Sequence, residues 1–202
     1  MKVLFFIDTH ENSSAMKHIK EKAKSADLIV CGGDFTIFEN NMDAVLREFN
    51  NFGKPMLIIH GNHETSSSVM MACESLKNLH FIHKSYYITE DLVFFGFGGG
   101  GFSIRDESFT REAESFMREL KTISDRNNKK YQLILITHAP PYGTKLDDIG
   151  EHVGNKNIAE FIQKHQPIIA MSGHLHENSG VEDKIGKTRI FNPGPDGMLL
   201  DL

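Results

Sequence analysis

Six short apolar runs recur along the 202-residue sequence. They cover residues 3–7, 27–31, 55–60, 92–97, 131–137 and 167–172. Their length and their β-branched and aromatic content predict buried strands. Between the first of these runs, polar stretches carry apolar residues at helical spacing, as at Ala15, Ile19 and Ala23. Strands that alternate with helices favour a parallel sheet in an α/β fold.

The second half of the sequence contains two further helical patterns and then changes character. Helical spacing predicts helices over residues 106–125 and 157–165. Three short segments separated by Gly and Pro follow, at residues 181–184, 187–191 and 198–200. Such segments favour antiparallel strands. Because the sequence contains no repeat and no linker-like tract, residues 1–202 are predicted to form one domain.

The charge and cysteine content exclude several classes of protein. Lys plus Arg total 22 against 27 for Asp plus Glu, and a net charge of -5 gives no general attraction for nucleic acid or anionic membranes. The apolar N-terminal run stops after five residues at Asp8, which is too short for a signal-peptide core or a membrane span. Cys31 and Cys73 are too few for a disulfide framework. The expected location is the reducing cytoplasm.

His, Asp and Asn residues gather directly after five of the predicted strands. The clusters are Asp8-Thr9-His10, Gly33-Asp34, Gly61-Asn62-His63-Glu64, Thr137-His138 and Gly173-His174-Leu175-His176. Because the carboxyl ends of parallel strands share one edge of a sheet, we expect these clusters to converge in space. Any one of them alone would be an ordinary turn or cap. As an ordered set, they indicate a binding site.

The residue types in these clusters suit divalent metal ions. Imidazole, carboxylate and amide oxygen bind ions such as manganese, iron and zinc. The clusters offer more of these groups than a single tetrahedral site uses. Two ions a few ångströms apart can share a carboxylate and clamp the attacking and leaving oxygens of a phosphoryl transfer. The sequence therefore predicts a two-metal site.

In their order along the chain, the motifs DTH, GD, GNHE, H and GHLH resemble those of the calcineurin-like metallophosphoesterase superfamily, over residues 8–176. The resemblance implies a four-layer α/β sandwich, in which two mixed, mostly parallel β-sheets are flanked by helices. It also implies a metal-dependent phosphoric ester hydrolase with two divalent ions. Manganese is the first choice, with iron, zinc, nickel and cobalt as alternatives.

Carried over motif by motif, the resemblance assigns the functional residues of the family to positions in this chain. The assigned ligands are Asp8, His10 and His176 for one metal, Asn62, His138 and His174 for the other, and Asp34 as the bridge. His63 matches the acid that protonates the leaving group after a metal-bridging hydroxide attacks phosphorus. The expected partner is a small phosphoester substrate.

Ile37 departs from the family pattern, because many members carry a carboxylate there in a GDxxD motif. In the phosphoprotein phosphatases that carboxylate pairs with the catalytic histidine, so His63 needs another orienting group, with Glu39 or a backbone carbonyl as candidates. The Arg of those phosphatases is also missing, which argues against a protein Ser/Thr phosphatase. The nearest cations, Arg105 and Lys145, are not adjacent to a ligand motif, so a phosphodiester is favoured over a phosphomonoester, whose third oxygen commonly meets a guanidinium.

Several alternatives stay open at this point. A retromer subunit with this fold is a scaffold, although it lacks the histidine present here as His63. Phosphomonoesterase or nuclease activity would use the same metals, but this acidic chain has no aromatic-basic stripe for a nucleic-acid strand. The glycine run at residues 96–101 does not suit a dinucleotide, because the next helix starts too late. His60 is predicted to lie in the core and His152 in a loop. The substrate, native metal and oligomeric state stay undetermined.

Overall fold

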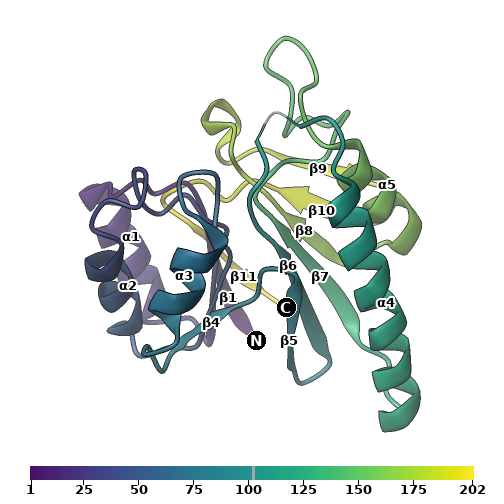
Figure 1. Ribbon diagram of the computed structural model, residues 1–202, viewed down its shortest axis with the longest axis horizontal. Coiled ribbons are helices and arrows are strands. Elements are labelled where there is room, and N and C mark those ends of the chain that lie inside the picture. Colours follow the sequence, from purple (N-terminus) through teal and green to yellow (C-terminus); the bar gives the residue numbers. More distant parts are fainter. Residues whose placement is uncertain (102) are drawn as a thin grey trace.

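Two β-sheets pack face to face in the computed structural model, which describes residues 1–101 and 103–202 (Figure 1). The first sheet has five strands in the order β11-β1-β2-β3-β4. They are β1 (Lys2–Phe6), β2 (Leu28–Cys31), β3 (Met56–Ile58), β4 (Leu79–Phe81) and β11 (Met198–Asp201). Strands β1 to β4 run parallel, whereas β11 pairs antiparallel with β1.

The second sheet has six strands in the order β5-β6-β7-β8-β10-β9. They are β5 (Ser85–Thr89), β6 (Leu92–Phe97), β7 (Gln132–Thr137), β8 (Ile169–Met171), β9 (Glu182–Ile185) and β10 (Thr188–Phe191). The four central strands are parallel and both edge strands are antiparallel. Antiparallel pairing was expected for all three strands after residue 180. The structure differs at β10, which also pairs parallel with β8.

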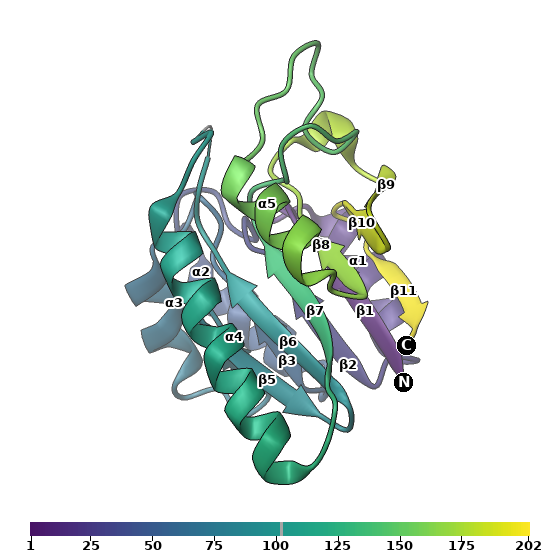
Figure 2. The ribbon, with the colours of Figure 1, turned by 90° about the vertical axis from the view of Figure 1, so that its right-hand side faces the viewer.

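Helices cover the outer face of each sheet, so the chain forms a four-layer α/β sandwich and the predicted fold class is confirmed (Figures 1 and 2). The helices over the five-stranded sheet are α1 (Ser13–Ala23), α2 (Met42–Asn50) and α3 (Ser66–Cys73). Those over the six-stranded sheet are α4 (Glu107–Asn127) and α5 (Lys156–His165). A short 3-10 helix, η1 (His176–Asn178), follows β8. Within the described residues, no helix has the length and apolarity needed to cross a membrane.

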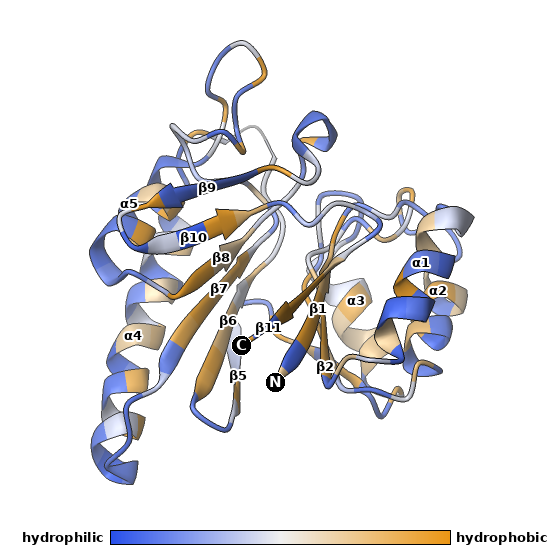
Figure 3. Ribbon diagram, turned by 180° about the vertical axis from the view of Figure 1, so that it is seen from behind, coloured by the Kyte–Doolittle hydropathy of each residue, from blue (hydrophilic) through white to orange (hydrophobic). Residues whose placement is uncertain are grey.

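Strand β1 is apolar throughout its buried length because both of its faces are covered. Val3 and Phe5 belong to the core between the two sheets, whereas Leu4 and Phe6 belong to the core under α1 and α2. Figure 3 shows the same hydrophobic colouring along the central strands of both sheets. A strand that is buried on both faces has a continuous apolar sequence, which is why such runs predict the central strands correctly.

The apolar pattern did not predict α3, β4 and β5. Helix α3 is short and begins with three serines, and its start is marked by Thr65, whose side chain accepts the N–H of Ser68. Strand β5 lies at a sheet edge, and none of its side chains is fully buried. An edge strand of this kind carries neither a continuous apolar run nor a clean alternation.

Candidate metal centre

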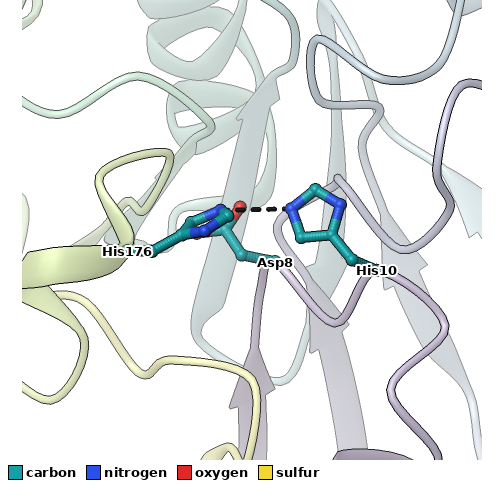
Figure 4. A group of neighbouring side chains, drawn as sticks. All are labelled: Asp8, His10 and His176. Carbon is teal, nitrogen blue, oxygen red and sulfur yellow. Dashed lines mark hydrogen bonds between the residues drawn. The ribbon is translucent and has the colours of Figure 1, made fainter.

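The five motif clusters meet where strands from both sheets end. His10, after β1, faces His176 in η1, and their Nε2 atoms lie 3.1 Å apart although 166 positions separate them in the sequence (Figure 4). A carboxylate oxygen of Asp8 lies near both histidines, so that one ligand atom from each of the three residues lies within 4.8 Å of the others. The first predicted group of ligands is therefore assembled in space.

The second group consists of Asn62, His138 and His174. Oδ1 of Asn62 lies 3.0 Å from Nε2 of His138 and 2.8 Å from Nδ1 of His174. Asp34 lies between the two groups, because its Oδ2 is 3.3 Å from Nε2 of His138 and 3.9 Å from Nε2 of His10. One carboxylate thus reaches both groups, as a residue that bridges two ions must.

Backbone carbonyls fix the orientation of two of the histidines. Nδ1 of His10 donates to the carbonyl of Thr36 at 3.1 Å, and Nδ1 of His138 donates to the carbonyl of Gly32 at 3.0 Å. A carbonyl can only accept, so in the neutral ring the proton lies on Nδ1 and the Nε2 lone pair is free for a metal. This outer contact is the usual one behind a metal-binding imidazole.

Asp8 carries an oxygen whose environment suits a cation. Its Oδ2 accepts the N–H of His174 at 2.8 Å, but its buried Oδ1 has no hydrogen-bond partner in the described part of the chain. Burial raises the pKa of Asp8, because an unpaired buried carboxylate is costly. A divalent ion would satisfy this oxygen, so the donor set fits the metal that the motifs imply.

Asp34 and His138 form a buried ion pair at the centre of the site. Burial alone would raise the pKa of Asp34, but the hydrogen bond and charge of His138 hold that pKa below its ordinary value. Burial alone would lower the pKa of His138, but Asp34 raises it to about 9. The raised pKa favours a protonated His138, and a metal ion bound here must displace that proton because a ligating imidazole is neutral.

The backbone at the site is strained. Asp8, His10, Asp34 and His174 all have positive φ, between 42° and 70°, which non-glycine residues adopt at a cost in free energy. Gly61 allows the close approach of Asp34, since a Cβ at position 61 would overlap the carboxylate of Asp34. Such strain persists only where the surrounding structure determines it, and four of the seven predicted ligands carry it.

Glu64 joins two of the loops that carry these ligands, a role that the sequence did not reveal. Its Oε2 accepts the N–H groups of Asp34 and Gly61, both at 3.0 Å. Its Oε1 accepts the N–H of Thr36 at 2.9 Å and the hydroxyl of the same residue at 2.7 Å. The buried carboxylate therefore ties the loop after β2 to the loop after β3. Its place at the end of the GNHE motif was the only signal.

His63 lies beside the site, and its ring contacts the rings of His10 and Phe38. Its backbone N–H donates to Oδ1 of Asp34 at 2.8 Å, and its ring lies edge-on to the ring of His10 with centroids 4.6 Å apart. Ligand atoms of these three residues also lie within 4.8 Å of one another, so His63 is close enough to contact an ion or its substrate. Glu39, a candidate orienting group, instead accepts the N–H of Thr65 at 2.7 Å.

Other singled-out residues lie in structural roles. His60 is buried and its Nδ1 donates to the carbonyl of Gly61 at 2.8 Å, so the predicted core histidine is confirmed. His152 contacts the fully buried carboxylate of Asp147, with Nδ1 and Oδ1 3.0 Å apart, which stabilises the loop before α5. Arg105 pairs with Glu160 of α5 at 2.9 Å.

Comparison with known families gives a match that covers most of the chain. The family model described as calcineurin-like phosphoesterase matches residues 1–178. A curated but uncharacterized protein of Methanocaldococcus jannaschii is 31% identical over 211 aligned positions, which span 99% of this chain and 91% of that protein. The motif resemblance and this match agree on the family.

Solved structures of low sequence identity share the fold. The protein TT1561 of Thermus thermophilus is 16% identical with a TM-score of 0.74, over 96% of this chain and 90% of that one. A structure described as a dimetal phosphatase from Danio rerio is 11% identical with a TM-score of 0.67, over 95% of this chain and 86% of that one. At such identities the likeness establishes the fold alone.

Proposed function

The chain belongs to the calcineurin-like phosphoesterase family, and on this premise we propose that it is a dinuclear metal-dependent phosphodiesterase. Membership of the family implies a phosphoric ester hydrolase. The observation that carries the proposal is the pair of ligand groups that share Asp34, whose Oδ2 lies within 4 Å of a histidine nitrogen from each group.

In the proposed site, Asp34 would hold two divalent ions through its carboxylate. The proposed ligands are Asp8, His10 and His176 on one side, and Asn62, His138 and His174 on the other. Manganese is proposed first, with iron, zinc, nickel or cobalt as alternatives, because the mixed imidazole, carboxylate and amide set suits borderline ions. The Danio rerio neighbour, described as a dimetal phosphatase, is consistent with two ions on this fold.

Two divalent ions bound here would supply an activated water nucleophile and positive charge for the phosphate oxygens. The residues of the chain do the rest. His10 and His138 are held by backbone carbonyls, so their orientation is set before an ion binds. His63 follows Asn62 in the sequence, and its backbone N–H donates to Asp34. Its imidazole is proposed to donate a proton to the departing oxygen.

The preference for diesters is proposed from the arginines. A phosphomonoester dianion presents a third oxygen, which phosphatases commonly bind with a guanidinium. Arg105 is paired with Glu160, and Arg189 is paired with Glu182, so both guanidinium groups already have a carboxylate partner. A diester has one charge and two non-bridging oxygens, one for each ion, and needs no third cation.

The test compares kcat/KM for bis(p-nitrophenyl) phosphate and p-nitrophenyl phosphate on manganese-reconstituted protein at one pH. A higher value for the diester is expected, and a clear monoester preference would contradict the substrate assignment. Asp34→Ala should abolish hydrolysis, whereas Asp125→Ala, an exposed aspartate of α4, should keep it. Equal rates for wild type and Asp34→Ala would refute the enzyme assignment.

A further inference from the structure

We infer that Phe38 is the positioning residue for His63, in place of the carboxylate that the family carries at the position of Ile37. The inference rests on the proposed function, because it concerns the group that serves the departing oxygen. Four observations carry it: the stacking of the two rings, a hydrogen bond from the backbone N–H of Phe38 to the His63 ring, the exposure of Phe38, and the strain in its loop.

The rings of Phe38 and His63 are stacked. Their centroids lie 4.3 Å apart and their planes differ by 22°. His10 lies against His63 as well, edge-on, with centroids 4.6 Å apart. The imidazole of His63 is therefore confined by an aromatic ring and by a proposed metal ligand, which limits its rotation about χ2.

The backbone of Phe38 also contacts the ring of His63. The N–H of Phe38 donates to Nδ1 of His63 over 3.4 Å, a long hydrogen bond. Because Nδ1 accepts, the neutral ring carries its proton on Nε2. The Nε2–H is then the one group of the neutral ring that can donate a hydrogen bond to the departing oxygen; transfer of a proton to that oxygen needs the imidazolium form of His63. A carboxylate at this contact could only accept a hydrogen bond, so it would have placed the proton of the neutral ring on Nδ1 instead.

Phe38 gains little from burial where it lies. Its side chain is 76% exposed, although phenylalanine is among the residues most often buried. Its φ is +49°, a left-handed conformation that is rare for a bulky residue. Neither feature stabilises the fold, so the ring is held on His63 at a cost, as strained residues at functional sites commonly are.

Hydrogen bonds accepted by two glutamates keep the loop in this conformation. Glu11 accepts the N–H of Ile37 at 3.3 Å and the side-chain amide of Asn41 at 3.0 Å. Glu39 accepts the N–H of Thr65 at 2.7 Å, which joins the loop to the start of α3 two residues after His63. The loop is thus fixed to the segment after the DTH motif through Glu11 and to the segment after the GNHE motif through Thr65. These contacts fix the position of Phe38.

The test combines kinetics with a double-mutant cycle on the manganese-loaded enzyme. Phe38→Leu keeps the N–H and the apolar character but removes the planar ring, so we expect kcat to fall about 10- to 100-fold with KM unchanged. Phe38→Tyr, which keeps the planar ring, should have the kcat of the wild type. In a His63→Ala background, Phe38→Leu should have no further effect. Met71→Ala, at a 67% exposed position on α3, is the matched control and should behave as wild type.

An equal loss from Phe38→Leu in the wild-type and His63→Ala backgrounds would overturn the inference, as would a rise in KM alone, which would mean that the ring binds substrate. A second measurement needs no metal or substrate. In metal-free protein with ¹⁵N-labelled histidine, the His63 nitrogens should show the Nε2–H tautomer. Phe38→Leu keeps the backbone N–H but frees the imidazole to turn away from it, so the nitrogens should shift toward an average of both tautomers. An unchanged spectrum would overturn the positioning role even if the protein proved not to hydrolyse phosphoesters.

Discussion

Replacing Glu64 by Gln should destabilise the protein and loosen the metal centre together. The carboxylate accepts four hydrogen bonds, two on each oxygen, at distances from 2.7 to 3.0 Å. Glutamine presents an NH₂ group in place of one oxygen, so two donors of the loops then face another donor. With the NH₂ group toward Asp34 and Gly61, two backbone N–H groups lose their acceptor. With the NH₂ group toward Thr36, the hydroxyl can turn but the backbone N–H of Thr36 cannot, so this orientation costs less.

The magnitude follows from the number of bonds. A hydrogen bond to a charged group contributes about 1.5–3 kcal/mol, and the bond from the Thr36 backbone N–H is lost while the Thr36 hydroxyl adapts, so the free energy of unfolding should fall by about 1.5–3 kcal/mol. Against a total stability of about 5–15 kcal/mol this is a large fraction. For a chain of this size it corresponds to a fall in Tm of about 3–12 °C.

The assay is urea unfolding of protein that a chelator has freed of metal, followed by manganese titration of the folded variant. Affinity for metal should fall as well, since Glu64 fixes the backbone on both sides of Asp34 and Asn62. Glu160→Gln is the control, because its pair with Arg105 is largely exposed and should be worth less than about 1 kcal/mol. If Glu64→Gln unfolds within 1 kcal/mol of wild type and binds manganese equally well, the role assigned to Glu64 is wrong.

Two further substitutions test single roles at the site. His63→Ala should lower turnover by about 10² to 10⁴ with metal content unchanged, and less for substrates with acidic leaving groups; a loss of metal would make His63 a ligand instead. Gly61→Ala should weaken metal binding about 10- to 100-fold because its Cβ would overlap the carboxylate of Asp34, whereas Gly101→Ala, where a Cβ meets nothing within 4 Å, should bind as wild type. Equal affinities for the two glycine variants would show that the Asp34 carboxylate can shift without loss.

The sequence predicted the parts of this fold that are buried on both sides. Strands such as β1 and β7 read as continuous apolar runs because a sheet or helix covers each face. The convergence of the motif clusters was also predictable, since parallel strands end at one edge of a sheet. The contacts of His10 with His176 and of His138 with Asn62 follow that expectation.

The missed features depend on tertiary contacts that no local pattern encodes. Glu64 is a buried carboxylate satisfied by the backbone of two distant loops, and nothing in the GNHE motif itself indicates those partners. Phe38 continues a stretch that looks like core, yet of its apolar residues only Phe35 is buried, and Ile37 and Phe38 are exposed. Left-handed φ at Phe38 and Glu39 turns the chain there, and such angles are not readable from Phe or Glu.

The most direct test of the two-metal centre is the count of ions per chain. Protein freed of metal by chelation, reconstituted with saturating manganese and cleared of loose ions should contain two manganese ions per chain by elemental analysis. Asp34→Ala should lose more metal than His176→Ala, because Asp34 is proposed to bind both ions and His176 only one. A single ion or trace metal in the wild-type protein under saturating conditions would contradict the account.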